Sequence, residues 1–302
     1  MNGTSTVGIV GLGAMGLPMA LRLAATPGVT VRGYDTAPAR RRLAADGGVV
    51  AVESAAGAGD GAQLLILSVR DGVQAENALF GEAGAASALP AGAVVLLTST
   101  IGADAARALG DRLAAAGLGL VDAPISGGPV RAGNGELLIV VGGAEHDVVA
   151  ARSVLERLAS TLTIVGPRVG DGQLVKVINQ LLAGVHIAAA AEAVALAVGV
   201  GLDPALVVQT LSAGAASSFM LSDRGPRMVQ ALDGDPEVRS RVDIFVKDMA
   251  LVARLAADAH IPAPVAAAAG QLYVIAERAG LGTSDDSTIV RMLAEGGQRE
   301  QP

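Results

Sequence analysis

The first 166 residues alternate between short apolar runs and segments with helical spacing, and this alternation constrains the fold most strongly. The runs are apolar on both faces, which is typical of strands that are covered on both sides in a parallel sheet. Strands that alternate with helices predict an α/β domain. The predicted strands are Val7–Val10, Thr30–Tyr34, Leu64–Val69, Val94–Leu97, Leu118–Val121, Leu137–Val141 and Leu162–Val165.

The pattern changes after Pro167, where no further strand is predicted. One helical pattern runs from Gly172 to about Val198, which is roughly 40 Å at 1.5 Å per residue. Shorter helices are predicted at Pro204–Ser212, Val242–Ala259 and Pro264–Ala279. We therefore predict an α/β domain over residues 1–166, an all-α domain over residues 167–302, and a long interdomain helix between them.

The composition excludes several classes of function. The 302-residue chain has a net charge of −7 and 2% aromatic residues, so the basic, aromatic-rich face of a nucleic-acid binder is not expected. It has no cysteine, which excludes thiol catalysis and zinc–thiolate sites. The long helix carries polar residues that are costly in lipid, namely Asn179, Gln180, His186 and Glu192, so we predict a core helix and no membrane partner. No signal-peptide pattern opens the chain, and the expected location is the cytoplasm.

A glycine-rich loop follows the first predicted strand and opens a helix. Its sequence is Gly11-Leu12-Gly13-Ala14-Met15-Gly16. In this context the first glycine allows a tight turn, the second lets the backbone approach a pyrophosphate, and the third allows close helix–strand packing. Free N–H groups at the start of the helix favour an anion. A plain glycine turn is the alternative, but the strand–turn–helix context favours a Rossmann-type domain that binds NAD through these six residues.

Asp35 ends the second predicted strand and is the candidate ligand of the adenosine ribose. A carboxylate there would repel the extra phosphate of NADP, so NAD is the predicted cofactor and NADP the less favoured one. Two alternatives stay open, since Asp35 could simply cap the next helix and Arg40 could bind a phosphate. Ser68 and Val69, which end the third predicted strand, are further predicted cofactor contacts.

The segment Asp122-Ala123-Pro124-Ile125-Ser126-Gly127-Gly128 lies at the end of another predicted strand. Ligands of open parallel sheets bind at such strand ends. The hydroxyl of Ser126 and the N–H groups of Gly127 and Gly128 are candidate ligands of a substrate carboxylate. The alternative is a turn without a ligand.

Only two of the 22 basic residues are lysines, Lys176 and Lys247. Lysine can give and take a proton, whereas arginine stays protonated. Lys176 and Asn179 share a helical face. The apolar neighbours Val175 and Val177 favour the neutral form of Lys176, which suits acid–base catalysis. The alternative is an ordinary surface lysine.

Other polar features have structural interpretations. His186 is expected to pack on an alanine-rich helix face, and Lys247 by itself is consistent with a surface ion pair. Asp285-Asp286 resembles a metal pair, but it lies in a Gly/Ser turn and is interpreted as a loop or helix cap, so no metal is predicted. Arg40-Arg41-Arg42 is interpreted as a solvated surface rather than a phosphate clamp.

Together, and in this order, the motifs resemble the β-hydroxyacid dehydrogenase family, which includes 3-hydroxyisobutyrate dehydrogenase and tartronate semialdehyde reductase. The resemblance covers about Val7 to Met292. It implies that Lys176 is catalytic, that Ser126, Gly127, Gly128 and Asn179 bind the substrate, and that Thr100 contacts the nicotinamide side of the cofactor. It also implies that Lys247 contacts cofactor or substrate. The family further implies a small hydroxy-acid substrate and a homodimer or homotetramer.

One position departs from the family, which often has a second asparagine where this chain has Gln180. The stretches 179–188, 242–248 and 285–287 are similar to a branch that oxidises the C2 hydroxyl of a four-carbon sugar acid, L-threonate, with NAD. Substrates of the 3-hydroxyisobutyrate or tartronate semialdehyde type remain alternatives. Imine reductases share the architecture but commonly lack the catalytic lysine. A non-catalytic NAD(P)-binding regulator is the alternative from a different class.

Overall fold

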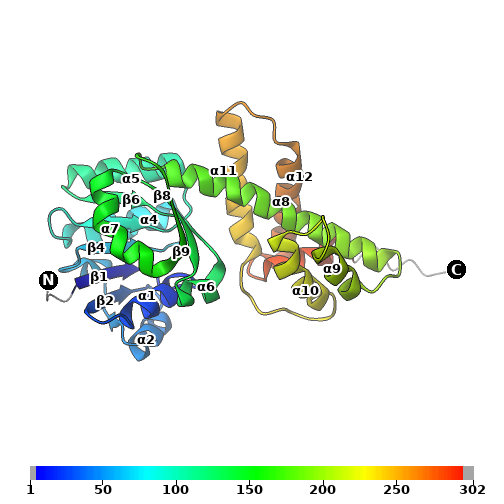
Figure 1. Ribbon diagram of the computed structural model, residues 1–302, viewed down its shortest axis with the longest axis horizontal. Coiled ribbons are helices and arrows are strands. Elements are labelled where there is room, and N and C mark those ends of the chain that lie inside the picture. The colour runs from blue at the N-terminus through cyan, green and yellow to red at the C-terminus, as the bar shows by residue number, and fades with distance from the viewer. Residues whose placement is uncertain (1–4, 295–302) are drawn as a thin grey trace. The chain divides into compact units, whose positions relative to one another are not determined.

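The computed structural model describes residues 5–294. The chain divides into two compact units between Lys176 and Val177. This boundary falls inside one continuous helix, α8 (Asp171–Gly199), so α8 contributes its first turns to one unit and the rest to the other (Figure 1). Each unit has a hydrophobic core of its own.

The first unit is built on one sheet, which has nine strands within residues 5–294. The strands are β1 (Ser5–Val10), β2 (Val29–Tyr34), β3 (Val50–Ala51), β4 (Leu64–Leu67), β5 (Val94–Leu97), β6 (Gly119–Asp122), β7 (Ile125–Ser126), β8 (Leu137–Gly142) and β9 (Ala159–Gly166). Their order is β3-β2-β1-β4-β5-β6-β8-β7, with β9 paired to β8. The first six strands are parallel, whereas β8 runs antiparallel to β6 and β7. The sequence predicted only a parallel sheet, because a run of apolar residues carries no information about strand direction.

Helices cover both faces of the sheet, as the doubly apolar strands predicted. The helices of this unit are α1 (Gly16–Ala24), α2 (Pro38–Asp46), α3 (Ala55–Gly59), α4 (Gly72–Phe80), α5 (Ala103–Ala115), α6 (Gly128–Asn134) and α7 (Glu145–Leu158), with a short turn of 3-10 helix, η1 (Ala85–Ser87). Alternate residues of β4 serve different cores: Ile66 packs with Leu23 of α1 and Leu155 of α7, whereas Leu65 packs with Leu79 of α4 and Leu113 of α5. This two-sided burial is the Rossmann-type arrangement.

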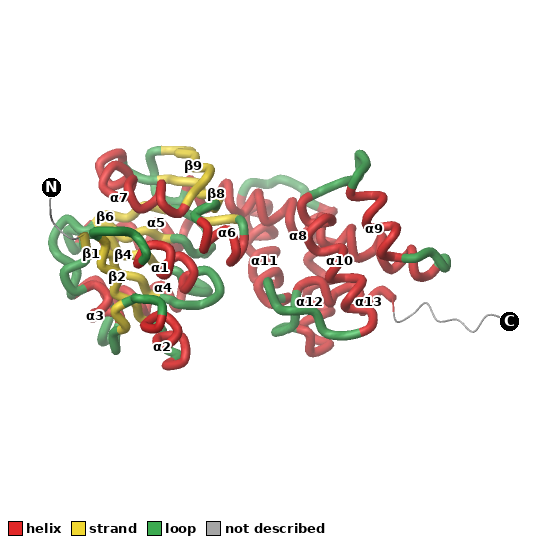
Figure 2. Tube along the Cα trace, turned by 60° about the horizontal axis from the view of Figure 1, so that its bottom comes forward, coloured by secondary structure: helices red, strands yellow, loops and turns green. Residues whose placement is uncertain are grey.

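The second unit is all-helical (Figure 2). Besides α8 it contains α9 (Pro204–Ser212), α10 (Phe219–Asp233), α11 (Val242–Asp258), α12 (Pro264–Ala276), η2 (Glu277–Leu281), η3 (Asp286–Val290) and α13 (Arg291–Ala294). The sequence prediction omitted α10, whose pattern is interrupted by Gly225 and Pro226. The helix nevertheless forms because Ser218 caps it, its side chain accepting from Leu221 N at 3.0 Å, and because Leu221 and Met228 pack in the core.

By length and composition, α8 is the one helix in residues 5–294 that is long and apolar enough to cross a membrane. Some of its polar side chains are nevertheless buried in the protein, whereas Glu192 and His186, which was expected to pack, are exposed. Gln173 and Gln180 are buried and hydrogen-bonded, and the Gly184 carbonyl accepts from Tyr273 Oη at 2.9 Å. Ile187 and Val194 of α8 lie in the core of the second unit. These contacts are those of a core helix, as predicted.

Candidate active site

The glycine loop has the geometry that a dinucleotide requires. Gly11 has φ +95°, and a Cβ there would lie 2.1 Å from the Ser68 carbonyl oxygen. A Cβ on Gly16 would lie 1.8 Å from the Gly11 carbonyl oxygen. Close backbone packing thus requires both glycines. Gly13 differs, because a Cβ there would meet nothing within 4 Å. This open space beside the backbone, just before α1, fits a pyrophosphate that approaches the main chain.

Asp35 lies beside this loop at the end of β2. Its Oδ2 accepts from Leu12 N at 2.7 Å and its Oδ1 from Ala37 N at 2.8 Å. The carboxylate therefore holds both the glycine loop and the turn before α2, so the capping interpretation is right in part. A carboxylate has about four lone-pair sites, which leaves capacity for ribose hydroxyls. Arg41 is occupied by the Asp35 carbonyl and by Glu53, each at 2.8 Å, whereas Arg40 is exposed.

The ends of β4 and β5 meet at the same edge of the sheet. Val69 N donates to Ser99 Oγ at 2.8 Å, and Ser99 Oγ donates to the Leu67 carbonyl at 3.3 Å. Ser68 lies against the glycine loop through its carbonyl, as described above. The structure thus brings Ser68 and Val69 to the glycine loop and to the segment that carries Thr100, which is half-buried.

A buried polar junction joins the ends of β5 and β6 to the start of α8. Gln173 Oε1 accepts from the backbone N of Ile101 and Gly102 at 2.8 and 3.0 Å. Its Nε2 donates to the Ser99 carbonyl at 3.0 Å and to Asp122 Oδ1 at 2.8 Å. All four hydrogen bonds of the amide are therefore made inside the protein, where its side chain is fully buried.

Asp122 completes this junction at the end of β6. Its Oδ2 accepts from the backbone N of Gly170 and Gln173 at 3.0 and 2.8 Å, so it caps the first turn of α8. Burial raises the pKa of Asp122 to about 6, although these hydrogen bonds lower it in part. The sequence analysis included Asp122 in the segment 122–128 but assigned no role to its side chain, and it assigned no role to Gln173. The available signal was a lone amide in the first turn of an apolar helix, one turn before Lys176.

The predicted carboxylate site follows β7. Ser126 is half-buried, and Gly127 and Gly128 have φ of +138° and +77°. Side chains rarely adopt these values, so the backbone here requires glycine. A Cβ on Gly128 would meet nothing within 4 Å, which leaves its backbone open to a ligand. The turn-only alternative accounts for the same angles and stays open.

Lys176 is buried, with 8% of its surface exposed, so the surface alternative for this lysine is wrong. Asn179, half-buried, and Gln180, buried, follow one turn later on the same helix. In the second unit, Asn179 Nδ2 donates to Gln180 Oε1 at 2.9 Å and Gln180 Nε2 donates to Asp248 Oδ2 at 2.6 Å. Lys247 Nζ lies 2.7 Å from Asp248 Oδ1. The sequence analysis missed Asp248, whose partner on α8 is 68 residues away.

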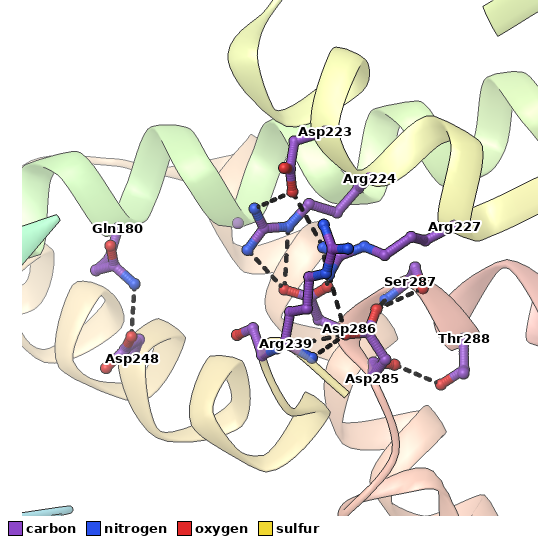
Figure 3. Close-up of polar contacts among 12 residues, drawn as sticks. Gln180, Asp223, Arg224, Arg227, Arg239, Asp248, Asp285, Asp286, Ser287 and Thr288 are labelled. Carbon is purple, nitrogen blue, oxygen red and sulfur yellow. Dashed lines mark hydrogen bonds and ion pairs between the residues drawn. The ribbon is translucent and has the colours of Figure 1, made fainter. Parts of the chain in front are cut away.

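The pair Asp285-Asp286 is held by arginines, as Figure 3 shows. Asp285 caps η3 by accepting from Ser287 N at 3.1 Å, which confirms the cap interpretation. Arg227 Nη1 lies 3.3 Å from Asp285 Oδ2, and Arg224 Nη2 lies 3.1 Å from Asp286 Oδ2. Among residues 5–294 no group of three or more His, Cys, Asp or Glu residues is arranged to hold a metal ion. The cluster therefore fixes η3 to α10.

The Rossmann-type sheet and its glycine loop define a dehydrogenase that binds a nicotinamide dinucleotide. Residues 6–166 match the model of the NAD binding domain of 6-phosphogluconate dehydrogenase. Residues 170–293 match the model described as NAD-binding of NADP-dependent 3-hydroxyisobutyrate dehydrogenase. The chain belongs to the β-hydroxyacid dehydrogenase family, and the fold expected from the sequence is confirmed.

Similar proteins match nearly end to end. The L-threonate dehydrogenase of Cupriavidus necator is 40% identical over 95% of this chain and 95% of its own length. The L-threonate dehydrogenase of Escherichia coli is 38% identical over 95% and 94%. Among solved structures, a 3-hydroxyisobutyrate dehydrogenase from Salmonella typhimurium has a TM-score of 0.89 and 36% identity, covering 95% of this chain and 99% of that one. The protein is thus an oxidoreductase of small hydroxy acids.

Proposed function

We propose that the protein oxidises the C2 hydroxyl of L-threonate to the 2-oxo acid, with NAD as hydride acceptor and Lys176 as general acid/base. The observation that carries the proposal is the burial of Lys176 one turn before Asn179 on α8. Several relatives that match over about 95% of this chain are named L-threonate dehydrogenases, which favours this substrate. The structural similarity to a 3-hydroxyisobutyrate dehydrogenase makes 3-hydroxyisobutyrate the second candidate.

Each proposed residue has a separate task. Ser126, Gly127 and Gly128 bind the substrate carboxylate, and Asn179 and Lys247 orient the rest of the molecule. Neutral Lys176 takes the proton of the C2 hydroxyl and becomes an ammonium ion. Bound NAD supplies the acceptor for the hydride that leaves C2. In the reverse direction, the Lys176 ammonium protonates the oxygen formed at C2. Well-placed acid–base catalysis of this kind contributes about 10²–10⁴-fold to the rate.

Apart from Lys247, the residues proposed to bind the cofactor lie at or near the carboxyl ends of the parallel strands. Gly11, Leu12, Gly13, Ala14, Met15 and Gly16 would hold the pyrophosphate, Asp35 the adenosine ribose, and Ser68, Val69, Thr100 and Lys247 the remainder. The carboxylate of Asp35 favours NAD over NADP. We assign cofactor binding to residues 1–166, and substrate binding and assembly to residues 167–302.

Assembly is expected to use the helical unit. Large apolar side chains are exposed there, including Leu196, Leu206 and Phe219, and such surface is typical of protein interfaces. We propose a homodimer or homotetramer in the cytoplasm. Imine reductases with TM-scores of about 0.62–0.65 share the fold, but Lys176 argues against imine chemistry and against a non-catalytic regulator.

The test is NADH formation by the purified protein with NAD or NADP and a panel of hydroxy acids: L-threonate, D-threonate, D-erythronate, 3-hydroxyisobutyrate and D-glycerate. We expect activity with NAD and L-threonate. Lys176→Ala should lower kcat by about 10²–10⁴-fold and leave the Kd of NAD unchanged, and Lys176→Arg should not restore kcat. Arg254→Ala, at an exposed position of α11, is the control. Full activity of Lys176→Ala would refute the assignment, and preference for another acid would refute only the substrate.

A further inference from the structure

A chain of polar groups with a buried centre connects α8 to α11 in the second unit. It consists of Asn179, Gln180, Asp248 and Lys247, and we refer to it as the amide relay. Figure 3 shows Gln180 on α8 directed at Asp248 on α11. Only 8% of Gln180 and 3% of Asp248 are exposed, so water cannot replace either partner. The hydrogen bonds of this relay therefore depend on which atom donates at each step.

The direction of the relay follows from the chemistry of Asp248. A carboxylate accepts hydrogen bonds and donates none, and the other oxygen of Asp248 lies 2.7 Å from the Nζ of Lys247. Gln180 must therefore present its NH₂ group to Asp248, as it does at 2.6 Å. Its carbonyl oxygen then faces Asn179, which must donate in turn, as it does at 2.9 Å. Reversing either amide would place two oxygens or two NH₂ groups against each other.

The relay thereby orients the amide of Asn179. With one N–H committed to Gln180, the Asn179 side chain has its carbonyl Oδ1 as an acceptor. No hydrogen bond to this oxygen is found within residues 5–294. Asn179 is half-buried, so a ligand can reach it. The geometry therefore offers the substrate a hydrogen-bond acceptor of fixed position one turn beyond Lys176.

A substrate can use this acceptor only through a hydroxyl that does not react. In the proposed function, on which this inference rests, the single proton of the C2 hydroxyl passes to Lys176. The substrate carboxylate has no proton to donate. The donor to Asn179 Oδ1 must then be a second hydroxyl, at C3 or C4. We propose that Gln180 and Asp248 are positioning residues that orient Asn179 and so select polyhydroxy acids over acids that lack the second hydroxyl.

The length of Gln180 matters to this role. Its Nε2 reaches Asp248 at 2.6 Å, and an asparagine is shorter by one carbon–carbon bond of about 1.5 Å. Gln180→Asn would leave a gap of about 4 Å, which is too long for a hydrogen bond. Lengthening the partner at the same time should close it, so Gln180→Asn combined with Asp248→Glu is the matched rescue variant.

The test compares kcat/KM for L-threonate with kcat/KM for its 3-deoxy and 4-deoxy analogues, 2,4- and 2,3-dihydroxybutanoate. The native enzyme should prefer L-threonate over at least one analogue by about tenfold or more, the effect of one well-placed hydrogen bond. Gln180→Leu should remove most of this preference by lowering kcat/KM for L-threonate, while kcat/KM for that analogue changes little. Gln180→Asn should behave similarly, and its combination with Asp248→Glu should restore part of the preference.

Control variants distinguish an effect on the orientation of Asn179 from an effect on folding. Asp258→Asn changes an exposed carboxylate near the end of α11 and should alter nothing. If Gln180→Leu does not fold, the double variant Gln180→Leu/Asp248→Leu removes both partners and leaves neither buried alone. A merely structural role would lower kcat/KM for all acids equally, so an unchanged preference in either folded variant overturns the inference.

Failure of the proposed function can be distinguished from failure of this inference. If the native protein turns over none of the acids, that function fails, and equilibrium binding of L-threonate and its deoxy analogues by calorimetry still tests the relay. Binding of L-threonate that is no tighter than binding of both analogues, or no binding at all, overturns the inference.

Discussion

Replacing Gln173 with leucine tests whether the junction at the start of α8 stabilises the fold. The native amide makes four hydrogen bonds, to the backbone of Ser99, Ile101 and Gly102 and to the carboxylate of Asp122. Leucine fills a similar volume but can make none of them. Three backbone groups and one carboxylate oxygen would then lose a partner in the interior of the first unit.

The magnitude follows from these four groups. A buried group left without its partner costs about 1–3 kcal/mol, which gives roughly 4–12 kcal/mol before relaxation. Leucine recovers about 2 kcal/mol by apolar burial, and Gly102 is only half-buried, so water can reach its N–H. We expect the free energy of unfolding to fall by about 4 kcal/mol, a large part of the 5–15 kcal/mol of a typical protein.

Urea unfolding followed by circular dichroism measures this loss. Gln173→Glu is the informative companion, because its carboxylate keeps the acceptor for Ile101 and Gly102 but faces Asp122 with a second charge. Burial already raises the pKa of Asp122 to about 6, so the pair should share a proton as the pH falls. The stability gap between Gln173→Glu and the native protein should therefore narrow between about pH 7 and about pH 5. A loss below about 1 kcal/mol in Gln173→Leu would refute the role of the junction.

The remaining predictions concern substitutions at four positions. The pKa of Asp122 is raised from 3.8 to about 6 on folding. The free energy of unfolding should therefore rise by about 1.4 kcal/mol as the pH falls from 8 to 5, because the folded protein binds the proton more tightly. In Asp122→Asn this pH dependence should disappear, as measured by urea unfolding at each pH. Gly16→Ala should lower the Tm because its Cβ meets backbone at 1.8 Å, whereas Gly13→Ala should keep the Tm and weaken NAD binding about tenfold in calorimetry. Asp35→Ser should raise kcat/KM with NADP relative to NAD by about tenfold, and an unchanged ratio would remove Asp35 from the ribose site.

The sequence predicted those parts of the fold whose signal is local. The strand predicted at Leu64–Val69 forms as β4 (Leu64–Leu67), and the loop from Gly11 to Gly16 lies between β1 and α1 as expected, because each signal is contained in a few consecutive residues. The two-residue strands β3 and β7 carry too few residues for a pattern. These two strands form because they pair with neighbouring strands of the sheet, and the residues of a two-residue segment do not show which strand it will pair with.

The polar residues that hold the candidate site were missed for a related reason. Asp122 and Gln173 are 51 residues apart, and Gln180 and Asp248 are 68 apart. Taken alone, each glutamine is one amide on a helix, where a solvated surface position is the ordinary interpretation. Lys176 was found because a lysine is rare in this chain, whereas nothing in composition distinguishes its two supporting glutamines.

These glutamines nevertheless explain how an apolar helix can hold Lys176, the lysine that we propose as catalytic, in place. Small alanine side chains give α8 few ridges, and a smooth helix can rotate or slide with little change in apolar contact. Gln173 and Gln180 are seven residues apart, so they project in nearly the same direction and bracket Lys176. Each is held by a buried carboxylate, Asp122 in the first unit and Asp248 in the second. Rotation of α8 would break both of these buried hydrogen bonds, so the two amides fix the direction of Lys176.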